Sequence, residues 1–585
     1  MPEAVSTVST APIAGQKPGT SGLRKKTREF MKENYVANFV QSTFNALKET
    51  PGGSALVGGG TLVVSGDGRF YNPEAIQIII KIAAANGVGR VWCGCDGILS
   101  TPGVSAVIRA RGKGSEAFGG FILTASHNPG GIDEDFGIKY NCENGGPAPE
   151  SLTDLIYKHT TSITSIQSCA GLADVDLSKP GVTNFDGFSV EVFDSTVDHV
   201  GVLTKCFDLA AIKALVSRPD FTVCYDAMHG VNGPYARAVF IDTLGCKEEV
   251  LQNCVPKPDF GGPNSASHGH ADPNLKNAVE LCARMKVGPT GDALPGSEGA
   301  PTLGAAADGD GDRNMILGPG FFVTPSDSLA VIVDQCAEGC VPQFKAGVGG
   351  AARSMPTSGA LDIVCKARNI PLFETPTGWK FFGNLMDSGK YSPFICGEES
   401  FGTGSDHVRE KDGMWAVLAW LQILAAKNPD STKPLVTVPD IVRAHWAKYG
   451  RNYYARHDYE GVETKSANDV MSNMIAKQGK WPQGAFAPFE LETQDVFEYK
   501  DPVDGSVTGN QGVRFMLKGG SRIIFRLSGT GVSGATIRVY LEKFEPPSGD
   551  LSLNAISVVE PLGLLARSLS DMQNLTGREG PSVIT

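Results

Sequence analysis

The stretch GGFILTASHNPGG, residues 119–131, decides the fold class of this 585-residue chain. It opens with a short apolar run, which is typical of a strand buried on both faces. The run leads into a polar segment that ends in a turn signal, Asn128-Pro129-Gly130-Gly131. Ligand sites in open α/β sheets lie at the carboxyl ends of strands. The stretch therefore predicts an α/β fold with a functional loop around Ser126.

Two later segments repeat this pattern of a strand that leads into a polar, glycine-containing loop. They are ADGDGDR at 307–313 and CGEESFG at 396–402. Strand and helix signals also alternate along the chain, as in TLVVSGD (61–67) followed by PEAIQIIIKIAAANG (73–87). This alternation predicts three α/β domains. We place them at residues 1–199, 200–335 and 336–427.

The remainder of the chain, residues 428–585, has a different pattern. SRIIFRLS (521–528) and ATIRVYLEKF (535–544) alternate apolar and polar residues, as antiparallel strands with one exposed face do. A fourth, α+β domain is expected there. The segment 288–304 is rich in Gly and Pro and has no periodicity, so it predicts a surface insertion.

Composition and charge limit the class of protein. The chain is 41% hydrophobic with a net charge of −11, which fits a soluble globular protein and argues against a general nucleic-acid binder. Its 13 cysteines include no CxxC pair, so free thiols in a reducing compartment are expected. No signal peptide is visible, and the longest apolar run, Met414 to Ala426, predicts a buried helix rather than a membrane span. We expect a cytoplasmic protein.

The segment DGDGD places three carboxylates, Asp308, Asp310 and Asp312, at alternate positions. Alternate residues of an extended segment face the same way, so the carboxylates should converge and repel unless a cation joins them. Oxygen ligands favour Mg²⁺ or Ca²⁺. An EF-hand loop is excluded, because its sixth position would be Arg313 instead of Gly and its twelfth Pro319 instead of Glu. A solvated acidic turn is the alternative, and the flanking apolar residues argue against it.

A glycine-rich segment, GTGVSG at 529–534, lies between two predicted strands. It matches GxGxxG, but no helix follows for a dinucleotide site, and too few residues remain for a kinase core. Arg526 and Arg538 frame it, and guanidinium and backbone N–H groups suit a phosphate dianion. A plain Gly-rich turn is the alternative. Further basic residues in polar or Gly-rich contexts indicate an anion-binding cleft; they are Arg24, Arg313 and Lys411.

Ser126 and His127 at first resemble a hydrolase fragment, but the GxSxG flanks of a nucleophile elbow are missing. Adjacent side chains in a strand point to opposite faces, so we expect His127 to be poorly placed to deprotonate Ser126. A helix N-cap is one remaining role for the serine. The predicted metal and phosphate loops favour another role, a serine that carries a phosphoryl group.

These motifs together resemble the phosphoglucomutases of the α-D-phosphohexomutase family. Segments typical of that family occur in its order over nearly the whole chain, namely KPGTSGLRKK, GDGRF, TASHNPGG, DGDGDRNMILG, TPTGWKFFGNLM, CGEESFGTGSDHVREKDG and FRLSGTG. Within the family the chain is most similar to the eukaryotic parafusin type, which the C-terminal TGREGPSVIT supports. The resemblance implies four domains around one deep cleft, with one loop from each domain. Three of the domains are similar α/β domains with mixed sheets, and the fourth is α+β.

The resemblance also implies roles for single residues. Ser126 corresponds to the serine that is phosphorylated in the resting enzyme, and a phosphoserine oxygen completes an Mg²⁺ site with Asp308, Asp310 and Asp312. Lys139 matches a general acid/base, and a role for His127 stays open. The remaining positions contact the substrate: Thr377, Gly378, Glu398 and Ser400 in the sugar loop, Arg526, Ser528, Thr530 and Arg538 in the phosphate clamp, and Arg24, Arg313 and Lys411 elsewhere.

The expected reaction interconverts glucose 1-phosphate and glucose 6-phosphate, with Mg²⁺ and with glucose 1,6-bisphosphate as intermediate and activator. A mutase for mannose or N-acetylglucosamine phosphates, a plain phosphatase and a non-catalytic scaffold at secretory vesicles are the alternatives. The resemblance to parafusin implies possible vesicle association, and the chain is expected to be a monomer or a dimer. An intact serine, aspartate triplet and phosphate clamp favour the glucose mutase.

Overall fold

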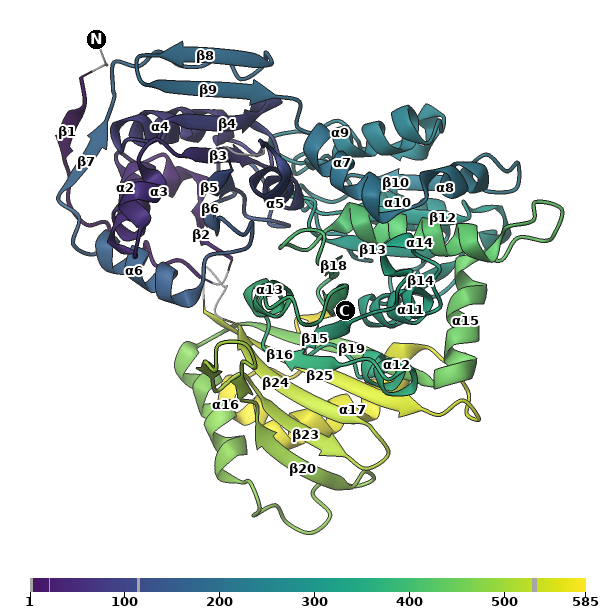
Figure 1. The fold of residues 1–585 in the computed structure, drawn as a ribbon. Helices are drawn as coiled ribbons and strands as arrows, with labels where there is room; N and C mark the ends of the chain where they lie inside the picture. Colours follow the sequence, from purple (N-terminus) through teal and green to yellow (C-terminus); the bar gives the residue numbers. More distant parts are fainter. Residues whose placement is uncertain (1–3, 20, 113–115, 529–533) are drawn as a thin grey trace.

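The chain folds into four main sheets that follow one another along the sequence (Figure 1). The computed structural model describes residues 4–19, 21–112, 116–528 and 534–585. The first three sheets combine parallel and antiparallel strands with helices between them, and the fourth is antiparallel. The predicted fold class, three α/β domains with mixed sheets and a C-terminal α+β domain, is confirmed.

The first sheet has seven strands in the order β2-β6-β5-β3-β4-β9-β8. Its strands are β2 Leu23–Lys26, β3 Thr61–Gly66, β4 Arg90–Gly94, β5 Ala117–Leu123, β6 Asp135–Cys142, β8 Gly181–Phe185 and β9 Phe188–Phe193. The helices are α1 Thr27–Phe30, α2 Tyr35–Glu49, α3 Gly53–Val57, α4 Asn72–Ala85, α5 Thr101–Ala110 and α6 Glu150–Thr160. A separate antiparallel pair joins β1 Ser6–Ser9 to β7 Ser165–Ser168.

The second sheet has the order β11-β10-β12-β13-β14. Its strands are β10 Val223–Asp226, β11 Leu251–Gln252, β12 Leu303–Ala307, β13 Asn314–Gly318 and β14 Phe321–Val323. The helices are α7 Val197–Cys206, α8 Leu209–Val216, α9 Asn232–Ala236, which continues into a π-helical turn at Arg237–Thr243, and α10 Val279–Met285. The predicted insertion 288–304 is wrong at its end, because Leu303 and Gly304 already form buried positions of β12.

The third sheet has the order β16-β15-β17-β18. Its strands are β15 Gly350–Ser354, β16 Leu372–Thr375, β17 Phe394–Glu398 and β18 Gly402–Ser405. The helices are α11 Pro325–Ala337, α12 Ala360–Arg368, α13 Trp379–Asp387, α14 Gly413–Lys427 and α15 Val438–Tyr449. The apolar run at Met414 to Ala426 forms α14, which is buried on all sides as predicted.

The three α/β domains share one topology. In each, a central strand pairs in parallel with two neighbours, and an antiparallel fourth strand follows the third. The orders are β4-β3-β5-β6, β11-β10-β12-β13 and β16-β15-β17-β18. The third strand of each set runs into one of the predicted loops: Ser126 after β5, the aspartates after β12 and Ser400 after β17. The repeated topology therefore presents one loop from each domain at the equivalent edge of its sheet.

The C-terminal sheet has the order β20-β23-β24-β25-β19-β26. Its strands are β19 Arg451–Val462, β20 Leu491–Val496, β23 Val513–Leu517, β24 Arg522–Ser528, β25 Ala535–Glu545 and β26 Val583–Ile584. The helices of the same domain are α16 Thr464–Ala476, α17 Ala555–Ser570 and α18 Met572–Thr576. A short pair, β21 Tyr499–Lys500 and β22 Val507–Thr508, lies apart from this sheet. The predicted antiparallel pairing of β24 with β25 is confirmed.

Two predictions from composition can be compared with the whole fold. All 13 cysteines are free thiols, as expected. Within the described ranges no helix is both long enough and apolar enough to cross a membrane.

Candidate active site

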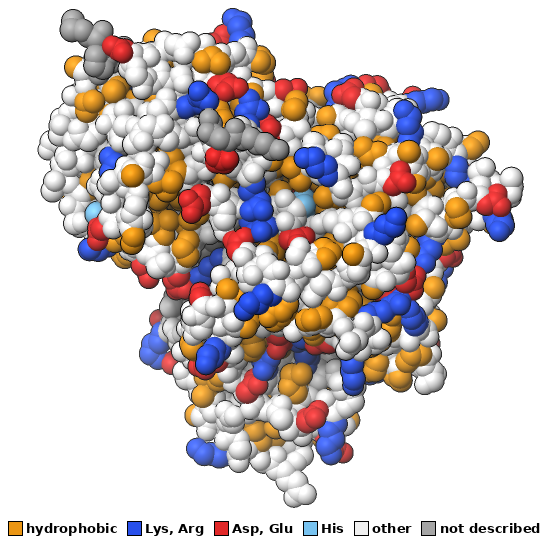
Figure 2. All heavy atoms as spheres, in the orientation of Figure 1, with side chains coloured by type: hydrophobic (Ala, Val, Ile, Leu, Met, Phe, Trp, Pro, Cys, Tyr) orange, Lys and Arg blue, Asp and Glu red, His pale blue; other side chains and the backbone are white. Residues whose placement is uncertain are grey.

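The predicted site residues meet in one cavity of about 390 Å³ that receives residues from all four domains. Figure 2 shows the surface hollowed between the N-terminal and C-terminal domains, with acidic and basic side chains gathered there. Asp308 and Asp310 have no exposed surface, and Thr530 falls in 529–533, outside the described residues. The other predicted residues line the cavity: Arg24, Ser126, His127, Lys139, Asp312, Arg313, Thr377, Gly378, Glu398, Ser400, Lys411, Arg526, Ser528 and Arg538.

Ser126 lies in the turn after β5 and has a left-handed backbone conformation, with φ of 55°. Its hydroxyl donates to Oδ2 of Asp308 at 3.0 Å, and Nδ1 of His127 lies 3.3 Å from the same Oγ. The expectation that His127 points away from Ser126 is therefore wrong. The strand ends at Leu123, so the alternation of strand side chains does not extend to the serine.

An ion pair for which the sequence predicted no role, Asp67 with Arg69, supports the serine turn. Both side chains are fully buried. The Arg69 guanidinium donates to the carbonyl oxygen of Ser126 at 2.8 Å and stacks on the ring of Phe260. Asp67 accepts the hydroxyl of Thr124 at 2.5 Å, and that hydroxyl accepts the N–H of Ser126 at 2.7 Å. The signal for these residues was the GDGRF segment, a charged pair directly after a buried strand.

The three aspartates converge as predicted, but they do so in a turn and not in an extended segment. Strand β12 ends at Ala307, and Gly311 has a φ of 76°, which favours glycine. One oxygen of each carboxylate lies within 4.8 Å of the other two. The hydroxyl of Thr101, at the start of α5, donates to Asp310 at 2.7 Å and ties the first domain to this turn.

The electrostatics of the turn fit a divalent cation. Burial and the neighbouring Asp310 and Asp312 raise the pKa of Asp308 well above its ordinary value. Burial would also raise the pKa of Asp310, but Lys139, the Thr101 hydroxyl and Lys411 outweigh it and lower that pKa to about 2. Oδ1 of both Asp310 and Asp312 is buried and accepts no hydrogen bond from the described residues, and the Lys411 ammonium lies 3.3 Å from Oδ1 of Asp312. Hard carboxylate oxygens are the ligands that Mg²⁺ takes.

Two lysines lie between the aspartates and the open cavity. Nζ of Lys411 is 3.3 Å from Asp312, and Nζ of Lys139 is 3.9 Å from Asp310. Lys139 also lies 3.6 Å from Glu410, a buried carboxylate that was not predicted from the sequence. Burial raises the pKa of Glu410, against the opposing effect of Lys139. No local pattern marks Glu410, because its partners come from β6, in another domain.

Several arginines line the cavity, among them a facing pair from the C-terminal domain. Arg526 and Arg538 face each other directly across β24 and β25, a pairing of like charges that destabilises a sheet. Asp458 is 3.9 Å from Nε of Arg538. Nε of Arg24, Arg313 and Arg538 is buried and makes no hydrogen bond within the described part of the chain. Such donors fit an anionic ligand, and a phosphate accepts bidentate guanidinium hydrogen bonds.

The same positive charge acts on His127. Burial, and then the surrounding Arg313, Arg24, Lys411 and Arg538, lower the pKa of His127 well below its ordinary value. The imidazole is therefore neutral near pH 7. A lowered pKa also makes this ring a weaker base than a free imidazole, and the Ser126 hydroxyl beside it already donates its proton to Asp308.

The third domain contributes neutral and acidic polar groups. Glu398 is buried at the end of β17 and accepts the N–H of Gly378 at 3.1 Å. Burial raises the pKa of Glu398, although Lys411 opposes the shift. The hydroxyl of Thr377 is buried and has no hydrogen-bond partner among the described residues. These oxygens can bind several hydroxyl groups of a sugar.

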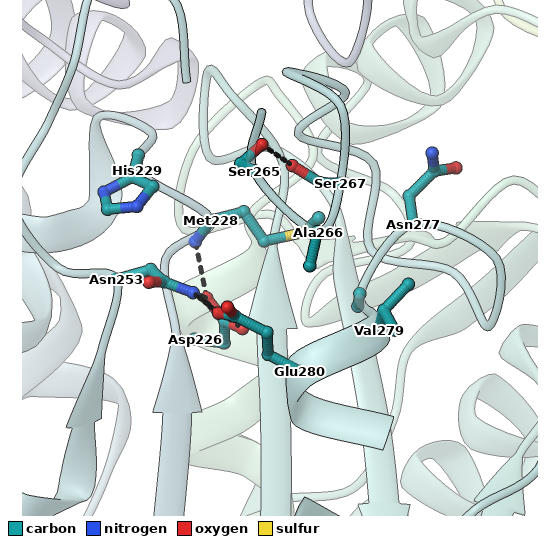
Figure 3. A pocket seen from close by; sticks show the side chains of 11 residues that line it. Asp226, Met228, His229, Asn253, Ser265, Ala266, Ser267, Asn277, Val279 and Glu280 are labelled. Atoms are coloured by element: carbon teal, nitrogen blue, oxygen red, sulfur yellow. Dashed lines mark hydrogen bonds between the residues drawn. The ribbon is translucent and has the colours of Figure 1, made fainter. Parts of the chain in front are cut away.

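A second cavity, of about 40 Å³, lies in the second domain beside Asp226 (Figure 3). Its carboxylate accepts the N–H of Met228 at 2.8 Å and the amide of Asn253, whose amide also donates to Glu280 at 2.7 Å. The carboxylate of Asp226 thus finds its hydrogen-bond donors within the protein. The volume suits a water molecule and is too small for a sugar phosphate, so the larger cavity is the candidate active site.

Comparison with known proteins agrees with this geometry. The chain is 56% identical over 597 residues to a probable cytoplasmic phosphoglucomutase of Arabidopsis thaliana, with 99% of each chain covered. It is 56% identical over 596 residues to a cytoplasmic phosphoglucomutase of Solanum tuberosum, again with 99% of each covered. This chain belongs to the phosphoglucomutase family.

Family models match four successive segments. The phosphoglucomutase/phosphomannomutase α/β/α domains I, II and III match residues 15–167, 197–319 and 325–449, and the phosphoglucomutase-1 C-terminal domain matches 451–582. The matched segments agree with the four sheets of this family member. The domain boundaries at 199/200, 335/336 and 427/428 stay predictions.

Solved structures of this family have the same fold. The crystal structure of the exocytosis-sensitive phosphoprotein pp63/parafusin, a phosphoglucomutase from Paramecium in its open form, superposes with a TM-score of 0.87. It is 48% identical, and the match covers 100% of this chain and 99% of the other. The predicted resemblance to parafusin-type phosphoglucomutases is confirmed. A putative phosphomannomutase from Thermus thermophilus, 22% identical with a TM-score of 0.64, shares the fold.

Proposed function

We propose that this protein is a phosphoglucomutase that interconverts glucose 1-phosphate and glucose 6-phosphate through phosphorylated Ser126. One observation carries the proposal. The Ser126 hydroxyl donates to the buried Asp308, and the same cavity also presents the Arg526–Arg538 pair. A phosphatase would need only the serine and the aspartates. A mutase must hold a second phosphate while it transfers the first.

The chemistry consists of two phosphoryl transfers. The bond between phosphorus and Oγ of Ser126 breaks as a bond to O6 or O1 of the bound sugar phosphate forms, which gives glucose 1,6-bisphosphate. The bisphosphate then reverses its orientation, and its other phosphoryl group returns to Ser126. Two transfers through a covalent serine replace one difficult transfer.

Each transfer to the sugar releases a proton from the attacking hydroxyl. Lys139 is the proposed acceptor, and it lies beside Asp310 and Glu410 on the wall of the cavity. His127 is a second candidate, because its neutral ring lies 3.3 Å from Oγ of Ser126. In the return transfer the same group gives the proton back to the sugar oxygen.

One Mg²⁺ per chain would be held by Asp308, Asp310, Asp312 and an oxygen of phosphorylated Ser126, where it would neutralise charge on the transferring group. The convergence of the three buried carboxylates and the unpaired Oδ1 of Asp310 among the described residues support this assignment. Arg526, Ser528 and Arg538, with Thr530, are proposed to clamp the phosphate that is not reacting. The other proposed contacts are Arg24, Arg313 and Lys411 for phosphate and Thr377, Gly378, Glu398 and Ser400 for the sugar.

The sugar contacts must tolerate two orientations of glucose. Glu398 and Thr377 offer acceptors and donors to hydroxyl groups without touching the clamp. Mutases for mannose or N-acetylglucosamine phosphates would share the serine, the metal site and the clamp, so assays with each sugar 1-phosphate separate the substrates. We propose a cytoplasmic location, as in the names of the plant relatives. Vesicle association, by analogy with the exocytosis-sensitive Paramecium protein, and a monomeric or dimeric state stay predictions.

The proposal is tested by following glucose 6-phosphate formation from glucose 1-phosphate with a coupled dehydrogenase. Full activity should need Mg²⁺ and a small amount of glucose 1,6-bisphosphate. Ser126→Ala should abolish turnover and the phosphorylated mass of the protein, while an exposed serine changed in the same way, Ser178→Ala, should leave both intact.

The outcomes are distinct. No product from the wild-type protein under full conditions would reject the mutase. Turnover in Ser126→Ala would reject the phosphoserine, and turnover after complete chelation of divalent metal would reject the metal site.

A further inference from the structure

Two histidines and an aspartate form a buried cluster behind the active-site wall. Nε2 of His199 lies 2.6 Å from Oδ2 of Asp412, and Nε2 of His407 lies 2.8 Å from the same oxygen. The side chains of His199 and Asp412 have no exposed surface, and that of His407 is 2% exposed. None of the three residues is used by the proposed reaction.

Hydrogen bonds account for this cluster. A carboxylate oxygen only accepts, so both imidazoles carry their proton on Nε2 and donate it to Asp412. Nδ1 of His407 is 2.8 Å from the Ser405 hydroxyl, and the other oxygen of Asp412 accepts the N–H of Trp415 at 3.0 Å. The same three residue types could hold zinc, but here Nε2 of both histidines and Oδ2 of Asp412 are already hydrogen-bonded to one another, and Nδ1 of His199 is buried with no partner among the described residues.

The cluster joins two domains. His199 lies in α7, in the segment matched by the domain II model, whereas Asp412 and His407 lie in the segment matched by the domain III model. His407 is only five residues from Asp412 in sequence, so its contact is local. The bond from His199 spans 213 residues and links the two domains.

Asp412 is also the next residue after the two that reach into the cavity. Lys411 contacts Asp312 at 3.3 Å, and Glu410 accepts the amide of Asn141 at 2.9 Å. The backbone of this segment is tied at both ends, because the N–H of Asp412 donates to Thr403 at 2.9 Å and the N–H of Arg409 donates to the Ser105 hydroxyl at 3.0 Å. Movement of Asp412 would therefore displace both cavity residues.

We propose that His199 is a positioning residue for the active site. By donating to Asp412 from a different domain, it fixes the segment 406–412 and so holds Lys411 and Glu410 in the cavity. Without this donor the buried Asp412 carboxylate would lose one of its three hydrogen bonds, a loss that favours displacement toward another donor. The catalytic part of this inference rests on the proposed function.

The test compares His199→Leu, which removes the donor, with His199→Gln, whose amide reaches about as far as Nε2 and restores an N–H. His445→Leu is the control, because His445 is a buried histidine in α15 outside the cavity lining. Amide hydrogen exchange of residues 403–412 reports the position of the segment. The KM and kcat for glucose 1-phosphate report its effect on the reaction.

We expect faster exchange at 403–412 in His199→Leu alone. Because Lys411 is a proposed binding residue, KM should rise about tenfold while kcat changes less than about threefold. His199→Gln should restore both, and His445→Leu should change neither. Unchanged exchange in His199→Leu would overturn the inference whatever the kinetics, and so would an equal loss in His199→Gln. The assay of the wild-type protein tests the proposed mutase activity by itself. A failure of that proposal is therefore distinguishable from a failure of the inference about His199.

Discussion

Single side chains in this protein depend on partners that are distant in the sequence. Ser126 takes its backbone conformation from a turn that Arg69 holds through the serine carbonyl oxygen. Its hydroxyl then points at Asp308 and lies beside His127, although neighbours in a strand would face apart. The serine is thus placed by a buried ion pair as much as by its own segment. The serine hydroxyl contacts the aspartate turn through Asp308, a carboxyl whose pKa is raised.

The raised pKa of Asp308 predicts that the requirement for Mg²⁺ increases as the pH falls. A protonated carboxyl is a poor ligand, so the metal must displace the proton, and acid favours the proton. The Mg²⁺ concentration for half-maximal activity should rise between about pH 8 and about pH 6.5, where the substrate phosphate still carries most of its charge.

The control for this titration is Asp308→Asn, which cannot take up that proton. It should need more Mg²⁺ at every pH and should show a flatter dependence on pH. A wild-type requirement that does not change with pH would contradict the assignment of the raised pKa to Asp308.

The loops that carry function follow equivalent strands. In each α/β domain the loop lies between the third strand and the antiparallel fourth strand, as after β5, β12 and β17. The chain reverses direction within each of these loops, so their polar groups stay at the sheet edge. The C-terminal domain reaches the cavity differently, through the antiparallel pair β24 and β25 and the two arginines that face each other across it. The facing like charges lower the stability of the sheet, but they place two guanidinium groups in the cavity lining.

Arg538→Gln should weaken substrate binding without destabilising the fold. The loss of a guanidinium–phosphate contact should raise KM for glucose 1-phosphate about tenfold or more. Removing one of two facing like charges should leave stability unchanged or raise it by up to about 1 kcal/mol. Steady-state kinetics and thermal unfolding measure the two effects.

Lys543→Gln is the matched control, because it removes one positive charge from the same strand, away from the cavity. It should change neither KM nor the unfolding temperature appreciably. A destabilised Arg538→Gln with an unchanged KM would show that Arg538 is structural and does not hold phosphate.

The whole molecule is held together by contacts between domains. The aspartate turn touches the first domain through Thr101 and the third through the backbone pairing of Arg313 with Gly402. The C-terminal domain has a further contact with the second, because the amide of Asn554 donates to Asp292 at 2.8 Å. Asp292 lies in the insertion 288–304, so the insertion bridges two domains at the surface. An exposed hydrogen bond of this kind contributes little to stability.

Asp292→Ala should therefore be nearly neutral. We expect a change in unfolding free energy below about 0.5 kcal/mol and a kcat/KM within about twofold of wild type. Asn554→Ala is the comparison: Asn554 also caps α17 by accepting the N–H of Ser557 at 3.1 Å, and loss of that cap should cost about 1 kcal/mol. A large loss of activity in Asp292→Ala would instead make the insertion part of the mechanism.

The sequence by itself determined the strands that lead into the loops of the candidate site and the chemical type of each loop. Hydrophobic periodicity and turn residues act over a few positions, so the apolar run before Ser126, the aspartate triplet and the hairpin strands around Arg526 and Arg538 were readable directly. The free thiols and the buried helix α14 followed from composition and from an unbroken apolar run.

Only the tertiary structure decided which side chains meet. Arg69 contacts the Ser126 carbonyl across 57 residues, Thr101 contacts Asp310 across 209, and Asn141 contacts Glu410 across 269. These groups are buried, and a buried polar group is stable only where packing supplies its partner. The partner is chosen by the way the domains pack, and no local pattern encodes that choice. The same reason explains why Glu410 could not be predicted from its own segment.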